Sequence, residues 1–263
     1  MTNTVAVASS YVTIGTTGCP PYDWSSQKTP NTARYQYYSW KITWPPVIST
    51  SKIYVGIYGA NGATNSNPIM GPIGLSVDGV PIYSNADANK LDAYINEGSS
   101  FDTVGGHPDI HYHEETANNV VITNTSGTSH SPLFGIMMDG VPIYGPYGDN
   151  GAVPTNLDAC NGHTDSTYGF YHYHLPANRA FPYTLACLSG CVYNAQDSSY
   201  TVPSTCAKSS TQYDYSSFKW SSSFTKATVT TVSSARGGRV GRGSDVWVAY
   251  AATVASTLAA LLL

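Results

Sequence analysis

The hexapeptide Asp78-Gly-Val-Pro-Ile-Tyr83 occurs a second time, unchanged, as Asp139-Gly-Val-Pro-Ile-Tyr144. In both copies the Asp-Gly pair separates two apolar runs, which is typical of a β-hairpin whose type I′ turn needs positive φ. We therefore expect strand, turn and strand over 73–83 and again over 133–144. Six identical residues in a row indicate an internal duplication, because recurring turn chemistry alone explains only the Asp-Gly pair.

The histidines follow the same duplication. His111-Tyr112-His113 recurs as His172-Tyr173-His174 at the same offset as the hexapeptide, and His107 is answered by His163 at a slightly shorter offset. Of the seven histidines, only His130 lies outside these matched positions. Side chains two apart on a strand point to one face, so each His-x-His pair is expected to project together.

This pattern predicts metal binding. Imidazole is the commonest protein ligand for transition metals, and a His-x-His pair on a strand can chelate one ion. The predicted ligands are His107, His111 and His113 in the first repeat, and His163, His172 and His174 in the second. Asp109, Asp165 and Asp139 are the candidate acidic partners that orient the imidazoles or add an oxygen ligand.

Two arrangements fit the spacing: one site in each repeat, or one composite site on a pseudo-twofold axis. We expect the imidazole pairs of both copies to crowd a shared polar pocket. A structural alternative is that each histidine is hydrogen-bonded to a carboxylate or a backbone carbonyl and only holds the repeats together.

Composition narrows the fold class. Of the 263 residues, 11% are charged and 12% aromatic, with 24 Gly, 16 Pro and 21 Tyr, whereas helical bundles are rich in Glu, Lys, Leu and Ala. The aromatic content is also too high for a disordered chain. We therefore expect an all-β, internally duplicated, β-sandwich or barrel-like domain with short helices and long loops, the best helix candidate being 86–95. A net charge of −4 leaves no basic surface for a nucleic-acid partner.

The predicted organisation has four parts. Residues 1–34 are a lead-in segment, and 35–206 form the duplicated domain, with repeats at about 73–115 and 134–176. Residues 207–235 are rich in Ser and Thr and resemble a solvated stalk. Residues 236–263 combine a polar spacer with a terminal apolar run, which is the layout of a GPI-attachment signal or a membrane anchor, with Ser233 and Ser234 as the attachment site.

Cysteine usage favours the secretory pathway. Cys19, Cys160, Cys187, Cys191 and Cys206 include no C-x-x-C pair, so disulfides in an oxidising compartment are expected, with one cysteine left over. The connectivity does not follow from spacing. The sequon at Asn124 agrees with secretion as a glycoprotein, and the tail adds a membrane as partner, so we expect an extracellular, cell-surface protein.

The second repeat carries a family resemblance. The motifs are His130-Ser-Pro-Leu-Phe-Gly135, Asp139-Gly-Val-Pro-Ile-Tyr-Gly-Pro-Tyr147, Leu157-Asp-Ala-Cys-Asn-Gly162, Tyr171-His-Tyr-His174 and Phe181-Pro-Tyr-Thr-Leu-Ala-Cys187. Over roughly 35–191 the chain resembles the YHYH-domain family, a set of mostly secreted proteins of poorly defined function. The resemblance implies secretion and a Cys160–Cys187 disulfide. The first repeat departs from the pattern, since Ile110 replaces the leading tyrosine.

Three functions are compatible with these observations. The first is an extracellular copper- or zinc-binding protein, with His163, His172 and His174 as principal ligands. The second is a non-catalytic structural protein that self-associates or docks on extracellular matrix or mineral. The third is a metal-dependent hydrolase using His163 with Asp165, or His174 with Asp139. No H-E-x-x-H, G-x-S-x-G or phosphate-binding glycine loop supports catalysis, so no catalytic residue is assigned.

Overall fold

The computed structural model describes residues 3–19, 35–102, 105–107, 111–113, 129–194 and 200–220, and the backbone of 227–231. The predictions made for Asp109, Asn124, Ser233, Ser234 and the tail 236–263 lie outside these residues. Within the described part, no helix has the length and apolar character needed to cross a membrane.

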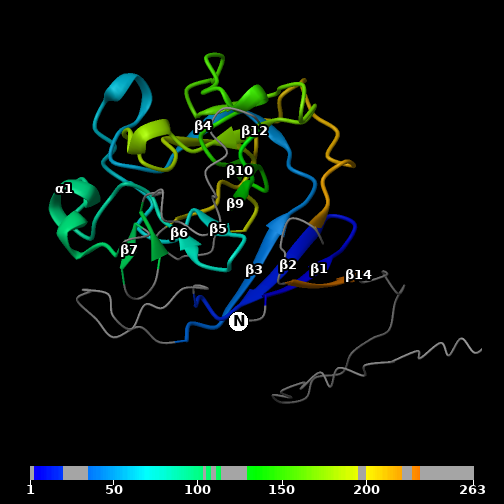
Figure 1. Ribbon diagram of the computed structural model, residues 1–263, viewed down its shortest axis with the longest axis horizontal. Helices are drawn as coiled ribbons and strands as arrows, with labels where there is room; N and C mark the ends of the chain where they lie inside the picture. Colours follow the sequence, from blue (N-terminus) through cyan, green and yellow to red (C-terminus); the bar gives the residue numbers. More distant parts are fainter. Residues whose placement is uncertain are drawn as a thin grey trace, which may run out of the picture. The chain divides into compact units, whose positions relative to one another are not determined.

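The duplication builds one eight-stranded sheet, with the strand order β11-β12-β10-β9-β5-β6-β8-β7. The first repeat supplies one half and the second repeat the other, and β9 and β5 meet in the middle (Figure 1). The strands are β5 (Gly74–Ser76), β6 (Pro81–Ile82), β7 (Gly106–His107), β8 (His111–Tyr112), β9 (Leu133–Met137), β10 (Pro142–Tyr144), β11 (Gly162–His163) and β12 (His172–His174).

A pseudo-twofold axis passes between β5 and β9. Leu75 pairs with Ile136, which is its own counterpart in the second repeat, and Gly74 and Ser76 pair with the counterparts of each other. Such pairing arises only when two equivalent strands face one another antiparallel. The His-x-His strands β8 and β12 consequently lie on opposite sides of the axis, with four strands between them. Five strand spacings amount to about 24 Å, so the expected shared pocket is wrong and each repeat has its own histidines.

The two predicted hairpins are present, but their turn type is not the expected one. Gly79 and Gly140 have φ of +87° and +86°, whereas neither Asp78 nor Asp139 has positive φ. The amide of Gly79 donates to the Ser76 carbonyl at 2.9 Å. This is the geometry of a type I turn closed by a left-handed glycine, which leaves each aspartate in ordinary backbone and frees its carboxylate for buried hydrogen bonds.

The segment predicted as a lead-in is part of the fold. β1 (Asn3–Val7) and β2 (Tyr11–Thr16) join β3 (Tyr38–Thr43) and β14 (Ala227–Thr231) in a four-stranded sheet with the order β14-β1-β2-β3. Buried residues alternate along β2, which explains why this strand stays in the sheet. A further pair consists of β4 (Ile48–Tyr54) and β13 (Cys187–Gly190).

The described part of the predicted stalk packs on the domain. Tyr215, Phe218 and Trp220 are buried, and their rings lie 4.7–5.5 Å from that of Trp44. The Tyr215 hydroxyl also donates to the Tyr171 carbonyl at 2.8 Å. Large aromatic side chains bury enough surface to offset the ordering of a polar segment. Residues 207–220 are therefore part of the domain rather than a solvated spacer.

Helices are short, as expected for an all-β chain. The only α-helix in the described residues is α1 (Ala93–Glu97), which begins later than the predicted 86–95 because Asp92 caps it by accepting from the Ile95 amide. The 3₁₀ turns are η1 (Ala60–Gly62), η2 (Gly98–Ser100), η3 (Asp149–Gly151) and η4 (Ala177–Arg179). In the described part the eight-stranded sheet is open at β11 and β7, so the architecture is layered sheet rather than barrel.

Two disulfides bind the C-terminal half together. Cys160 is linked to Cys187, the pairing that the family resemblance implies, and Cys191 is linked to Cys206, while Cys19 is a buried free thiol. The first bond ties the loop before β11 to β13. Two disulfides in a chain of this size fit an extracellular protein.

The pseudo-twofold contact can be tested at Gly135. A Cβ added there would lie 2.3 Å from the Leu75 carbonyl oxygen, which is backbone on the paired strand. We expect Gly135→Ala to lower the free energy of unfolding by about 1–3 kcal/mol in urea denaturation, the usual cost of overpacking. Gly169→Ala is the matched control, because nothing lies within 4 Å of its added Cβ. Equal effects of the two substitutions would contradict the close contact between repeats.

Candidate metal centres

All seven histidines gather in two clusters, one at each outer end of the eight-stranded sheet. The first cluster contains His107 on β7, His111 on β8 and His113 directly after β8. The second contains His130, His163, His172 and His174, together with Asp165. The structure thus brings together the predicted ligands within each repeat, but not between repeats.

The second cluster is a convergence of Nε2 atoms. The Nε2 of His174 lies 3.1 Å from that of His163 and 3.2 Å from that of His172, and the Nε2 atoms of His172 and His130 are 3.3 Å apart. β12 directs His172 and His174 to one face, as residues two apart on a strand require. β11 pairs His163 directly opposite His172. Strand pairing therefore places three of the four rings.

The other ring nitrogen of every imidazole in this cluster faces an oxygen. The Nδ1 atoms of His174 and His172 lie 2.6 and 3.0 Å from the carbonyls of Gly145 and Phe170. Those of His130 and His163 lie 2.8 Å from the Ser131 carbonyl and the Asn156 Oδ1. A carbonyl oxygen only accepts, so these Nδ1 atoms carry the proton and the Nε2 atoms carry lone pairs.

Neutral imidazoles with these tautomers direct their Nε2 lone pairs at one another. Burial lowers the pKa of His172 and of His174 to about 3, and it also lowers the pKa of His163. These imidazoles are therefore neutral at neutral pH, and their Nε2 atoms repel one another unless a cation lies between them. Nitrogens coordinated at 2.0–2.1 Å around a tetrahedral ion are about 3.3 Å apart, which is close to the separations here.

Asp165 adds an oxygen to this cluster. Its Oδ2 lies 3.2 Å from the Nε2 of His130 and 3.7 Å from those of His163 and His172. This buried oxygen has no hydrogen-bond partner, whereas buried carboxylate oxygens are normally paired. The sequence predicts Asp165 as an acidic partner of the imidazoles, and it does lie next to them. Because its Oδ2 faces their Nε2 atoms, it is a candidate for a direct ligand rather than for an orienting group.

The first cluster is smaller. The Nε2 atoms of His111 and His113 are 3.0 Å apart, and one nitrogen from each of the three histidines lies within 4.8 Å of the others. The Nδ1 of His113 lies 2.7 Å from the Ser84 carbonyl, and burial lowers the pKa of His113 to about 4. The buried Nε2 of His107 has no hydrogen-bond partner and lies 3.6 Å from the Glu97 carboxylate.

The two clusters share the same supporting contacts. Ser84 and Gly145, which hold His113 and His174, occupy equivalent positions of the two repeats, since the same offset relates both pairs. His107 and His163 are each held by the side chain seven residues before them, at 3.3 Å by Ser100 and at 2.8 Å by Asn156. The repetition therefore includes the groups that orient the imidazoles.

The predicted role of Asp139 beside an imidazole is wrong. Its carboxylate accepts from the Tyr173 hydroxyl at 2.7 Å and from the amides of Val141 and Gly190. Tyr173 lies between the two histidines of β12 and so points to the opposite face of the strand. Asp139 belongs to that opposite face, and the proposed dyad with His174 does not form. Asp78 holds Tyr112 in the same way at 2.9 Å in the first repeat.

Sequence reasoning missed His130, because this residue has no matched partner in the first repeat. It comes from the loop before β9, and its side chain is 3% exposed within the second cluster. The available signal was its place directly before Ser131 and Pro132 in the family-like motif. His130 reaches the cluster because the hairpin of β9 and β10 pairs with β12. The spacing of the histidines in the sequence does not reveal this pairing.

Comparison with known proteins identifies one match. The family model described as YHYH protein matches residues 39–155. This range contains the first cluster and His130, and it ends before β11 and β12. No curated protein and no solved structure matches the chain.

The neutral state of the clusters predicts a pH dependence for the chelator-treated protein. The ordinary histidine pKa is 6.5, and it is lowered to about 4 in His113 and about 3 in His174. Between these values the unfolded chain binds more protons than the folded chain, so the free energy of unfolding should fall as the pH falls from 6.5 toward 4. Urea denaturation at several pH values measures this slope.

Asp139, whose pKa burial raises to about 6, contributes a slope of opposite sign. The double variant His113→Gln, His174→Gln isolates the contribution of the histidines. Its free energy of unfolding should fall less steeply than that of the wild-type chain as the pH falls. An identical slope in both proteins would show that these imidazoles are not held neutral.

Proposed function

We propose that this chain, which belongs to the YHYH family through residues 39–155, binds a transition-metal ion through the second histidine cluster. The observation that carries the proposal is the convergence of four Nε2 atoms. In each of these four rings the other nitrogen, Nδ1, faces an oxygen acceptor. A purely structural role would use imidazoles as hydrogen-bond donors and acceptors in turn. Here the four acceptor nitrogens are directed at each other, which favours a cation at their centre.

The donor set favours zinc or copper(II). Four imidazole nitrogens and one carboxylate oxygen suit the borderline ions of this class, whereas Mg²⁺ and Ca²⁺ require mainly oxygen ligands. No cysteine belongs to the cluster, so the soft thiolate set that selects copper(I) is lacking among its described members. Because the side chains of His172, His174 and Asp165 are 0–6% exposed, the ion would be largely shielded from solvent.

The surrounding residues support tight rather than transient binding. Each imidazole is oriented before the ion arrives, so little rotamer entropy is lost on binding. The ring of His130 also packs edge-on against Tyr144 and Tyr168 at 5.0 and 4.9 Å. These contacts fix the one imidazole that comes from a loop.

A second candidate function, assembly at an extracellular surface, is favoured by two exposed aromatic side chains. Tyr35 and Tyr37 are 68% and 83% exposed, and their rings are stacked 6.4 Å apart. Such rings offer contact area at low entropic cost to a second copy, a matrix polymer or a mineral surface. Attachment to a membrane through residues 236–263 would complement this role. Concentration-dependent light scattering that Tyr35→Ser, Tyr37→Ser abolishes would support it.

The metal proposal is tested by calorimetric titration of zinc into the full chain carrying His111→Ala, which removes one imidazole from the first cluster and isolates the second. We expect one ion per chain. Adding His130→Ala should weaken its affinity by about 10–100-fold and adding His172→Ala by at least as much, in the range known for altered metal sites.

The His111→Ala protein itself is the matched control for loss of a histidine. Near-ultraviolet circular dichroism checks that each variant keeps its tertiary packing. His130→Ala is the safer of the two ligand variants, because its side chain comes from a loop rather than from β12. The proposal fails if the His111→Ala protein takes up neither zinc nor copper at micromolar concentrations.

A further inference from the structure

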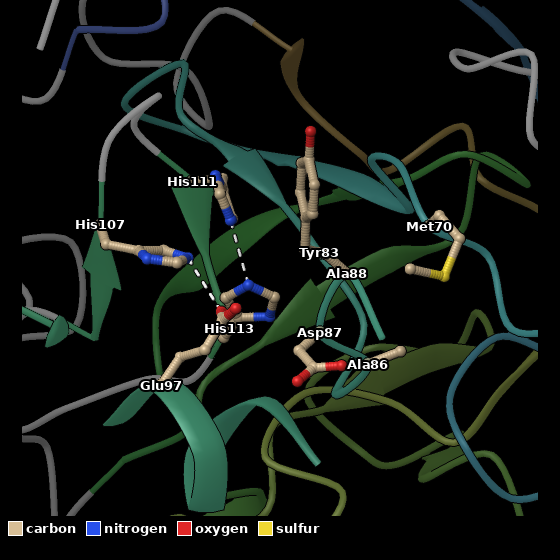
Figure 2. Close-up of a pocket in the computed structure, with 9 residues that line it drawn as sticks. All are labelled: Met70, Tyr83, Ala86, Asp87, Ala88, Glu97, His107, His111 and His113. Carbon is tan, nitrogen blue, oxygen red and sulfur yellow. Dashed lines mark hydrogen bonds and ion pairs between the residues drawn. The ribbon is translucent and has the colours of Figure 1, made fainter. Parts of the chain in front are cut away.

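The two clusters differ in the number of imidazoles and in their access to solvent. The first cluster borders a cavity of about 180 Å³, which is also lined by Tyr83, Asp87 and Glu97. Figure 2 shows the imidazoles of His107, His111 and His113 at this cavity, with Glu97 extending from α1 beside them. A ligand can reach the nitrogens of this cluster from the cavity.

The first repeat lacks the fourth imidazole. The offset that relates the two repeats places Ile69 at the position equivalent to His130, and Ile69 is 3% exposed and offers no ligand atom in its side chain. The backbone of Ile69 is bound by Val55 and Ser84, at 2.9 and 3.2 Å. An apolar residue is therefore fixed at the place corresponding to a ligand of the second cluster.

Two acidic residues lie on the cavity wall. Glu97 is not in the group of ligand atoms that all lie within 4.8 Å of one another, and Asp87 is committed elsewhere. Its Oδ1 accepts from the amides of Asn89 and Leu91 at 2.8 Å each, and its Oδ2 accepts from Asn96 at 3.1 Å. Three imidazoles thus supply three of the four ligands that a tetrahedral ion needs. Closed sites use four protein ligands, whereas sites that exchange ligands keep one position open.

We propose that the first cluster is a second metal centre of a different kind, in which three imidazoles hold the ion and one coordination position faces the cavity for a neutral nitrogen-donor ligand. This inference rests on the proposed metal binding and adds an exchangeable position to it. The second cluster stores or sequesters an ion, whereas the first presents one to other molecules.

The cavity wall determines the class of ligand. Asp87 and Glu97 place two carboxylates on it, and none of the described lining residues is a lysine or an arginine. An anion entering the cavity is therefore repelled, while a neutral donor that also carries an N–H can donate to a carboxylate. The ring of Tyr83 stacks on His111 at 4.0 Å and provides a flat apolar wall. An imidazole, either free or as the side chain of a histidine-containing peptide, meets each requirement.

The test uses the full chain with His172→Ala, which disables the second cluster, loaded with cobalt(II). Visible absorption reports the coordination of cobalt while imidazole or azide is added. We expect imidazole to shift the absorption bands and to saturate at a concentration well below that of azide. Glu97→Gln, which removes a negative charge from the wall, should reduce this preference. If His172→Ala does not fold, His130→Ala combined with Asp165→Ala takes its place, because this pair removes both ligand candidates that the second cluster takes from loops.

The matched control is His111→Ala, in which the second cluster is intact and the first is not. It should bind cobalt with an absorption spectrum that neither imidazole nor azide changes. Cobalt binding by His111→Ala but not by the protein with the disabled second cluster would overturn the inference and leave the proposed function standing. Failure of His111→Ala to bind cobalt, zinc or copper would overturn the proposed function itself. Bound cobalt that ignores imidazole, or that prefers azide, would refute the open position or its ligand class.

Discussion

The hydrogen bond from an imidazole Nδ1 to a fixed oxygen is the constraint on which both clusters depend. In His113 and His174 it is formed with backbone carbonyls at 2.7 and 2.6 Å, at equivalent positions of the two repeats. This bond assigns the proton to Nδ1, fixes the plane of the ring and leaves the Nε2 lone pair directed into the cluster. These carbonyls belong to Ser84, which follows β6, and Gly145, which follows β10. Because β6 and β10 are the second strands of the two hairpins, the sheet itself sets the orientation of the imidazoles.

The duplicated sheet explains why the two centres are separate and why they differ. The pseudo-twofold axis between Leu75 and Ile136 places the His-x-His strands on opposite sides, so each histidine cluster is built within its own repeat. The second cluster also includes His130 and Asp165 from nearby loops. The first has Ile69 at the corresponding place and a cavity beside its three imidazoles. One ancestral arrangement has thus given a closed and an open version of the same cluster.

The local features of the fold could be predicted from sequence because they depend on neighbouring residues. The hairpins follow from the Asp-Gly pairs, and the grouping of His172 with His174 follows from strand geometry. The position of Asp139 could not be predicted, because it depends on which face of β12 the hairpin turn approaches. The role of His130 and the packing of Tyr215 on Phe170, with ring centroids 5.0 Å apart, depend on contacts between distant segments that leave no periodic signal. The strands within 1–34 were missed because their alternation is short and lies outside the repeat.

The most direct test of the central claim is X-ray absorption at the zinc edge of the His111→Ala protein loaded with one equivalent of zinc. The convergence of Nε2 atoms predicts a first shell of three or four nitrogens at about 2.0–2.1 Å, with the outer-shell scattering that is characteristic of imidazole rings. A shell of solvent-like oxygens without imidazole scattering would contradict it, since the ion would then be bound outside the cluster that the hydrogen bonds prepare.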